Sequence, residues 1–446
     1  MNRVSLWVLF FYIGFGSVFL SPVFGDKIKN HEEIEARFSE KLYLSDLLKY
    51  AYLTSPMIEA FKESWKITIE EYRIGQSYPD PQLMTTYFPA PIETRLGPQD
   101  WNLTLSQEIP FPGKLGQQAK VLEAETRISK LQLDKTIKTI TASITSSFYE
   151  LGYIQTAIQV AKANFNLNQS LLQIGQNAYA DDKAQFYDVA KAQAQVAQIQ
   201  YDILLLEELL QAEKAKINGL LNRAPQADLG VAQELMFRPV QVDINEIYQL
   251  VNEHQEDILI AREKIEKSDE AVALSKFDNL PSFKLGLFYA AIGEPDVPSP
   301  PKNAGDDAIG IQFGLNIPLW FGKNNSKVSK ALAIRQKARA EKQTIANSTK
   351  TRISRLWFKL QNANRLITLY EDQLIPQSLK SVQTAETWYR QGEGSFSDFL
   401  ELQATAYNFQ LSLSRAKADY GQTLTGLELL TGVLLDRKTD ITKGGK

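Results

Sequence analysis

Residues 103–114, LTLSQEIPFPGK, have a second copy at residues 311–323, IQFGLNIPLWFGK. In both copies, alternating apolar and polar residues end at an Ile-Pro pair, and Gly-Lys follows within a few residues. Alternation with a period of two is typical of a strand with one apolar face, and proline ends a strand because it cannot donate the next ladder hydrogen bond. The sequence therefore predicts two strands that each lead through a short junction into the next element. The junction residues are Pro110, Gly113, Pro318 and Gly322.

A second repeated stretch has the same spacing along the chain. QNAYADDKAQFYDVAKAQ begins at Gln176 and ETWYRQGEGSFSDFLELQ begins at Glu386, so that Tyr179 aligns with Tyr389, 210 residues later. A period this long exceeds the unit of a solenoid and indicates a duplicated half-protein. The sequence is accordingly divided into a signal peptide, two structural repeats and a flexible C-terminal tail. These segments are residues 1–25, 26–235, 236–432 and 433–446.

The N-terminus has the pattern of a secretory signal. Arg3 precedes an apolar run from Leu6 to Leu20, and polar residues begin at Asp26, so cleavage is expected near Gly25. A retained membrane anchor is the alternative, but the run is short for a span of ~20 residues.

Bulk composition argues against several classes of function. The 446 residues carry a formal net charge of −3 and no cysteine, so neither a nucleic-acid partner nor thiol chemistry is expected. His31 and His254 are isolated, and no hydrolase, metalloprotease or nucleotide-binding motif is present. The chain is therefore expected to hold no cofactor or metal and not to be an enzyme.

Long stretches of helical periodicity dominate both repeats. Each repeat is expected to begin with a helix of about 35 residues, at residues 42–76 and 243–277. Residues 115–178 contain no proline and predict a helical rod of ~90 Å. In the second repeat Pro376 predicts a kink, whereas the first repeat has Asn166 at the aligned position.

Each repeat also predicts one antiparallel hairpin whose strands have one apolar and one polar face. A polar loop at residues 89–100 or 293–307 is expected to connect the two strands of each hairpin. Strands of about nine residues with this alternation fit a transmembrane barrel. Four strands cannot close a barrel, so several copies must share one. Three copies would supply twelve strands and an open lumen; two copies, the less favoured alternative, would give a narrow eight-stranded barrel filled by side chains. The predicted strands are residues 83–90, 101–109, 283–291 and 309–317.

The two repeated motifs resemble those of the TolC, or outer membrane efflux protein, family. The resemblance lies in the duplicated strand–Ile-Pro–Gly-Lys–helix junctions and in the duplicated turns from Tyr179 to Asp188 and from Tyr389 to Asp398. It covers about residues 42–432. The sequence SQEIPFPGK is similar to that of the family branch that serves cation and metal pumps.

The resemblance implies an α+β membrane protein in the outer membrane of a Gram-negative-type bacterium. Its homotrimer would form a twelve-stranded β-barrel in outer-membrane lipid, continued by a twelve-helix periplasmic tube. A periplasmic adaptor and an inner-membrane pump of the resistance–nodulation–division or ABC type would be its partners. The expected function is passive efflux of drugs or metal cations. Type I protein secretion and a periplasmic coiled-coil scaffold without a pore remain alternatives.

The two polar turns at the repeated motif are the expected periplasmic tips of the helices. Acidic rings there would favour cations, and tyrosines would narrow the mouth. The alternatives are an ordinary solvated turn between two helices and tyrosines that pack in the core. The candidate gate residues are Asp181, Asp182, Glu393, Tyr179 and Tyr389, and the candidate adaptor-docking residues are Arg390, Gly392, Gly394 and Ser395. Asp188 and Asp398 are expected to cap the helices that follow the turns.

Overall fold

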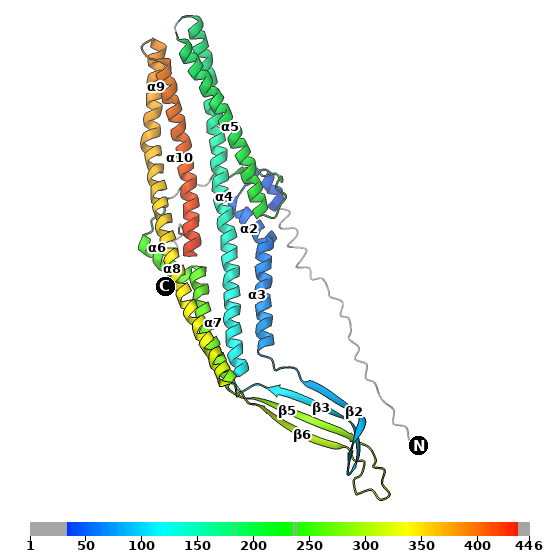
Figure 1. Ribbon diagram of the computed structural model, residues 1–446. Helices are drawn as coiled ribbons and strands as arrows, with labels where there is room; N and C mark the ends of the chain where they lie inside the picture. Colours follow the sequence, from blue (N-terminus) through cyan, green and yellow to red (C-terminus); the bar gives the residue numbers. More distant parts are fainter. Residues whose placement is uncertain (1–33, 183, 235–236, 238, 436–446) are drawn as a thin grey trace, which may run out of the picture.

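The computed structural model describes residues 34–182, 184–234, 237 and 239–435; the expected signal peptide and most of the expected tail lie outside them. The chain is an elongated rod with long helices at one end and a sheet at the other (Figure 1). Both helical hairpins end in turns at the pole opposite the sheet.

The same order of elements occurs twice. The first set comprises α2 (Leu44–Thr54), α3 (Pro56–Gly75), β2 (Gln82–Thr94), β3 (Gly97–Ile109), α4 (Lys114–Ala180) and α5 (Phe186–Leu220). The second comprises α6 (Ile244–His254), α7 (Glu256–Lys276), β5 (Ser282–Ile292), β6 (Ala308–Asn316), α8 (Phe321–Leu369), the π-helical turn η3 (Tyr370–Leu374), α9 (Ile375–Gln391) and α10 (Phe396–Thr431). A short parallel pair, β1 (Lys41–Leu42) with β4 (Val231–Ala232), ties the start of the first set to its end.

The single opening helix predicted for each repeat is wrong. In the first repeat the helix breaks at Ser55, which adopts an extended conformation with ψ 116° and accepts a hydrogen bond from the Ile58 amide at 3.4 Å. Pro56 then begins α3, where the missing N–H costs nothing. In the second repeat the helix breaks at Gln255, whose side chain accepts a hydrogen bond from the Ile258 amide at 3.2 Å and caps α7, with no proline after it.

The long helices follow the sequence closely. α4 has 67 residues, which corresponds to a rod of ~100 Å. In the second repeat the π-helical turn η3 lies directly before Ile375 and Pro376, whereas α4 is uninterrupted at Asn166. The wider turn relieves the clash that the proline ring would otherwise make with the preceding turn. The two repeats therefore differ in helix geometry where the sequence predicted a difference.

The four strands form one antiparallel sheet in the order β2-β3-β5-β6. The β3–β5 pair joins the hairpins, running from Ile109 opposite Phe283 to Gln99 opposite Ile292. The long polar loop predicted at residues 89–100 is wrong, because β2 continues to Thr94 and β3 starts at Gly97. The register shifts between Tyr87 and Ile92, where Pro89 and Pro91 cannot donate to the ladder.

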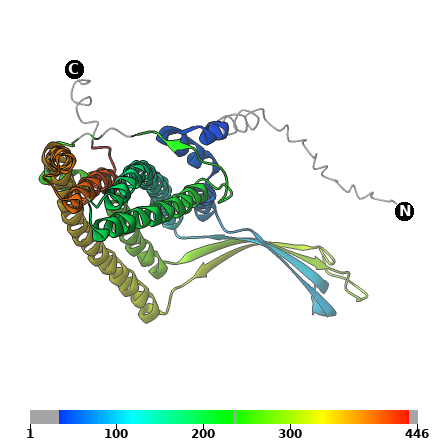
Figure 2. The same ribbon diagram turned by 90° about the horizontal axis from the view of Figure 1, so that it is seen from above.

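The helices form a curved layer rather than a compact bundle. Nearer the sheet, α3, α4, α7 and α8 pack side by side in that order. Towards the tips the order is α5, α4, α10 and α9. Figure 2 shows the layer end on, with the orange helices at one side and the blue ones at the other.

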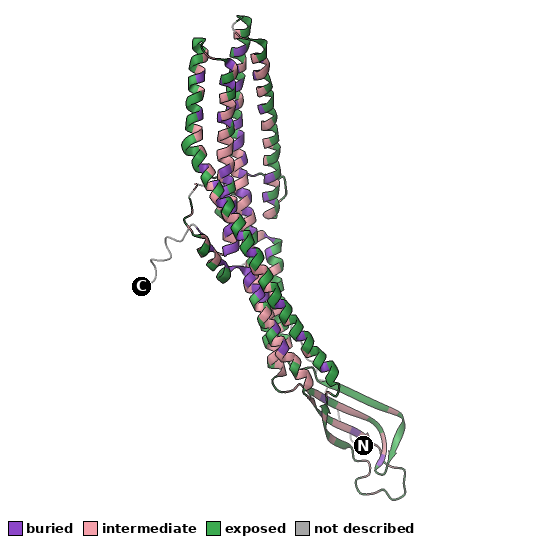
Figure 3. Ribbon diagram, turned by 60° about the vertical axis from the view of Figure 1, so that its left-hand side comes forward, coloured by how far each residue is buried: buried purple, intermediate pink, exposed green. Residues whose placement is uncertain are grey.

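Apolar residues are buried in three separate clusters. One joins α2 and β1 to α4 and the end of α5, the second joins α6 to α8 and α10, and the third lies near the tips. Figure 3 shows buried residues on the facing sides of neighbouring helices, while much of α8 and α9 is exposed. The described part of the chain thus has edges, α3 and α8 below and α5 and α9 above, that each pack on one side of the layer only.

Candidate functional site

The two strand–helix junctions are built differently. After β3, Gly113 adopts φ +89°, a conformation that side chains disfavour, and the Lys114 amide donates to the Phe111 carbonyl at 3.0 Å. After β6 the chain passes Pro318, and α8 begins at Phe321, so Gly322 lies within the first helical turn with no atom near its Cβ position. Gly113 makes the turn possible, whereas Gly322 has no such role in its repeat.

A carboxylate joins the two junctions. Asp278 accepts from Lys114 at 3.1 Å and from Lys327 at 2.8 Å, and its carbonyl accepts from the Asn324 side chain at 2.8 Å. Burial alone would raise the pKa of Asp278, but the hydrogen bonds from Lys327 and Lys114 outweigh it and lower that pKa. Asp278 therefore links the start of α4 to the start of α8, at the end of the sheet where the helices begin.

The sheet has one apolar and one polar face. Pairing places Leu105 opposite Leu287, and Leu287 opposite Ile311, on one face. Ile311 is 79% exposed and Leu287 57% exposed, so this face is open in the single chain. The other face carries short or polar residues, such as Ser106, Gly286 and Gln312.

The first tip turn follows α4. Asp181 ends that helix, its amide donating to the Asn177 carbonyl at 3.1 Å, and Asp182 adopts a left-handed φ of 54°. Both carboxylate side chains belong to exposed residues. Tyr179 is 48% exposed and packs edge-on against Phe186, with ring centroids 6.1 Å apart.

Asp188 and Asp398 occupy equivalent positions but do not make equivalent caps. The Asp188 carboxylate accepts from the Gln185 amide at 3.4 Å and completes a reciprocal capping box with Gln185. At the start of α10, Ser395 is the N-cap residue, but it makes no side-chain capping hydrogen bond. The expected cap is therefore present at Asp188, and Asp398 makes no such box.

The second tip turn follows α9 and is tighter. Gly392 adopts φ +77° and donates to the Tyr389 carbonyl at 3.1 Å, while the Glu393 amide donates to the Trp388 carbonyl at 3.0 Å. A Cβ at Gly394 would meet the Trp388 Cβ at 3.0 Å. The conformation of the turn itself therefore explains why both positions are glycine. The exposed Arg390 pairs with Glu386 at 2.7 Å on the same helix.

The two turns end separate hairpins, as Figure 1 shows, but the hairpins pack together just below them. Phe396 is 3% exposed, and a Cβ at Gly175 would lie 3.1 Å from its ring. The Lys191 ammonium donates to the Ser397 hydroxyl at 2.7 Å. Burial raises the pKa of Tyr389, and the nearby Asp188 carboxylate adds to the rise.

The gate candidates therefore fall into two groups. The two tyrosines pack within the protein: Tyr179 against the Phe186 ring, and Tyr389 against the cluster that joins the hairpins. The acidic residues Asp181, Asp182 and Glu393 lie on exposed turns of different hairpins. A ring of these acids within one copy does not form, so any ring requires several copies.

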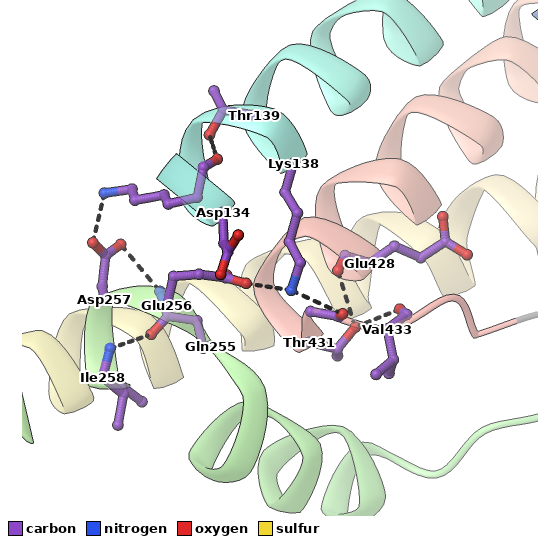
Figure 4. Close-up of polar contacts among 12 residues, drawn as sticks. Asp134, Lys138, Thr139, Gln255, Glu256, Asp257, Ile258, Glu428, Thr431 and Val433 are labelled. Atoms are coloured by element: carbon purple, nitrogen blue, oxygen red, sulfur yellow. Dashed lines mark hydrogen bonds and ion pairs between the residues drawn. The ribbon is translucent and has the colours of Figure 1, made fainter. Parts of the chain in front are cut away.

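Sequence reasoning missed the polar contacts between the two repeats. Lys138 on α4 contacts the buried Glu256 at the start of α7 and donates to the Gly432 carbonyl at 3.1 Å. Figure 4 shows Lys138 pointing between these elements, with Asp257 held by a neighbouring lysine. The partners are more than a hundred residues apart in the sequence, so no local motif could identify them.

Over residues 34–435, outside the few gaps, no helix is long and apolar enough to cross a membrane. Within the same described residues, no three His, Cys, Asp or Glu side chains are grouped to hold a metal ion.

Comparisons with known proteins find a family match in the second repeat and a shared fold along most of the chain. Residues 247–433 match the family described as outer membrane efflux protein. No curated protein sequence matches the chain.

Solved structures match over most of the chain. The outer membrane protein VceC of Vibrio cholerae has a TM-score of 0.72 at 18% identity, covering 87% of this chain and 96% of VceC. CusC, whose structures concern transmembrane channel formation, has 0.75 at 14% identity, covering 89% of this chain and 93% of CusC. The open MtrE outer membrane channel of Neisseria gonorrhoeae has 0.70 at 13% identity, covering 88% and 90%. Residues 247–433 thus match the outer membrane efflux protein family, and along most of its length the chain has the fold of these solved channels.

Proposed function

We propose that this chain is an outer-membrane efflux duct that works as a homotrimer. Three copies would share a twelve-stranded barrel and continue it as a twelve-helix tube across the periplasm. An inner-membrane pump would supply the energy and a periplasmic adaptor would join pump and duct. The duct itself would conduct cargo passively.

The open edges of the chain carry this proposal. In the described residues, β2 and β6 each pair on one side only, and the four strands expose one apolar face. Unpaired strand edges in lipid cost several kcal/mol for each unsatisfied backbone group, on the order of 2–7 kcal/mol. Closure through further copies removes both edges at once.

The helical layer has edges in the same places. α3 ends next to β2, and α8 begins next to β6, so a ring that pairs β6 with the next copy's β2 also brings α8 beside the next copy's α3. The exposed side of α3 carries Ile67 (57% exposed) and Ile74 (72% exposed), seven residues apart. Ala333 and Ala340 on α8 have the same spacing and are exposed. The two small alanines facing the two isoleucines would let the helices pack closely.

Cross-linking tests this closure directly, because the chain has no native cysteine. We expect the double variant Ile67→Cys plus Ala333→Cys, treated with a short bismaleimide in outer-membrane vesicles, to give dimer and trimer bands in denaturing gels. Each single variant is the matched control and should stop short of the trimer. Monomer alone in the double variant, with both cysteines reactive towards a maleimide dye, would argue against the proposed ring.

A further inference from the structure

α8 carries a charge imbalance that the rest of the chain does not share. It contains twelve lysines and arginines and a single acidic residue, Glu341, so its formal charge is 12 − 1 = +11. The whole chain has a formal charge of −3. Concentrating this much positive charge on one helix is a cost in self-repulsion that a merely solvated face does not require.

Half of these cations form one stripe. Lys323, Lys330 and Lys337 follow one another at seven-residue intervals, which keeps them on one side of a helix with 100° per residue. Further along, Arg352, Arg355 and Lys359 continue the same side within a sector of about 60°. The six residues are exposed and span ~54 Å of helix.

Most of the stripe has no partner within the described part of the chain. Lys337 lies 3.6 Å from Glu341. The other five side chains make no ion pair there, whereas Lys327, Arg335 and Arg339, elsewhere around the same helix, pair with Asp278 or Asp269. The stripe is therefore free to bind something else.

A cleft shows which side of the layer the stripe faces. It has a volume of about 950 Å³ and lies where the strands meet the helices. Lys323, at the start of the stripe, lines it together with Glu108, Ser282 and Asn316. Glu108 and Ser282 share a hydrogen bond of 3.1 Å, Ser282 pairs with Asn316, and all three belong to the polar face of the sheet. The stripe thus begins on the side of the polar face.

In a sheet that closes in a membrane, the polar face must line the water-filled hole and the apolar face must meet lipid. We infer that the stripe from Lys323 to Lys359 lines the lumen of the duct and binds anionic cargo, with carboxylate, phosphate or sulfonate groups. This inference rests on the proposed function and names its substrate class. A lumen walled by low-dielectric protein focuses the field of such cations and raises the local concentration of anions.

The acidic turns at the tips would repel an anion, so the anionic probe must enter from the side where it meets the stripe first. Inorganic tripolyphosphate added on the barrel side of channels in planar bilayers, at low salt, meets the stripe before it meets the tips. We expect it to block wild-type conductance. The variant Lys330→Gln plus Lys359→Gln should need at least ~5-fold more tripolyphosphate for half-block, since two cations per chain are gone.

The matched control is Arg339→Gln plus Lys350→Gln. These two residues lie on the same helix, about 180° from the stripe, and their loss removes the same charge. The control should block as the wild type does. Raising the salt concentration should weaken the block in every variant, and less steeply in the stripe variant, which keeps four of its six stripe cations per chain.

Three results would overturn the inference. Absence of block in wild-type channels would do so while leaving the duct intact. Equal shifts in the stripe and control variants would assign the block to general charge. Loss of the trimer in the stripe variant alone, seen by size-exclusion chromatography, would show that the stripe pairs with a neighbouring copy instead. Failure of the wild type to form trimers or channels at all would overturn the proposed function itself.

Discussion

Arg415 on α10 donates two hydrogen bonds, of 2.8 and 2.9 Å, to the carboxylate of Glu150 on α4, 265 residues away in the sequence. The guanidinium also lies 4.5 Å from the centre of the Tyr153 ring and contacts Asp419 at 2.6 Å. Gln422 donates to the same carboxylate at 2.6 Å. This cluster locks the first repeat to the second midway along the helices.

Breaking the Arg415–Glu150 pair should loosen the contact between repeats. The Arg415 side chain is 32% exposed and Glu150 23% exposed, so solvent screens part of the interaction, and we expect Arg415→Ala to cost about 1–2 kcal/mol. Thermal unfolding in detergent, followed by circular dichroism, measures this. Lys417→Ala is the control, because its pair with Glu371 at 3.1 Å is more exposed. Equal losses in both variants would argue against a special role for Arg415.

The same pair predicts a dependence on pH. Burial alone would raise the pKa of Glu150, but hydrogen bonds from Arg415 and Gln422 outweigh it, and the pKa lies below its ordinary value. A lowered pKa gives stability that is complete above the unfolded pKa, about 4.3, and is lost as the pH falls through the folded pKa. The difference in melting temperature between wild type and Glu150→Gln should therefore be largest near neutral pH and shrink in acid. A difference that grows in acid would contradict this sign.

Gly113 and Gly322 make a matched pair for testing the junctions. Gly113→Ala forces a side chain into φ +89° and should cost about 1–2 kcal/mol. Gly322→Ala lies in the first turn of α8 with open space around it and should be neutral or stabilising by up to ~1 kcal/mol. Denaturation midpoints of the two variants measure the contrast. Similar costs for both would mean that the junctions are alike after all.

The acidic tips can be tested by charge removal that keeps the turn intact. Asparagine tolerates the left-handed φ of Asp182, so Asp181→Asn plus Asp182→Asn removes charge without adding strain. If three copies place these acids around a narrow mouth, the variant should conduct more, or be blocked less by a trivalent cobalt complex added from the tip side. Glu393→Gln should act in the same direction. Glu208→Gln, exposed on α5, is the control, and single-channel traces identical to wild type would remove these acids from the gate.

The sequence predicted what local pattern controls and missed what tertiary contacts control. Alternation gave the four strands, and the proline-free run gave α4 with its end within two residues of Ala180. The break at Gln255 was missed because a glutamine cap has no strong local signature. The Arg415–Glu150 pair was invisible because its partners meet only after the repeats pack.

The candidate site was predictable to a similar degree. The tip turns lie where the repeated motif predicted them, at the ends of α4 and α9. The conformation of the second turn already accounts for its two glycines, so adaptor docking at Gly392 and Gly394 stays a prediction. The stripe on α8 could have been found by counting charges along the helix, but only the sheet register shows which side it occupies.

Native mass spectrometry of the protein extracted from outer membranes in detergent tests the central claim most directly. If edges β2 and β6 must be closed by further copies, the folded protein will appear as a trimer, and dissociation will release single chains only together with loss of structure. A stable, folded monomer under the same conditions would contradict the account.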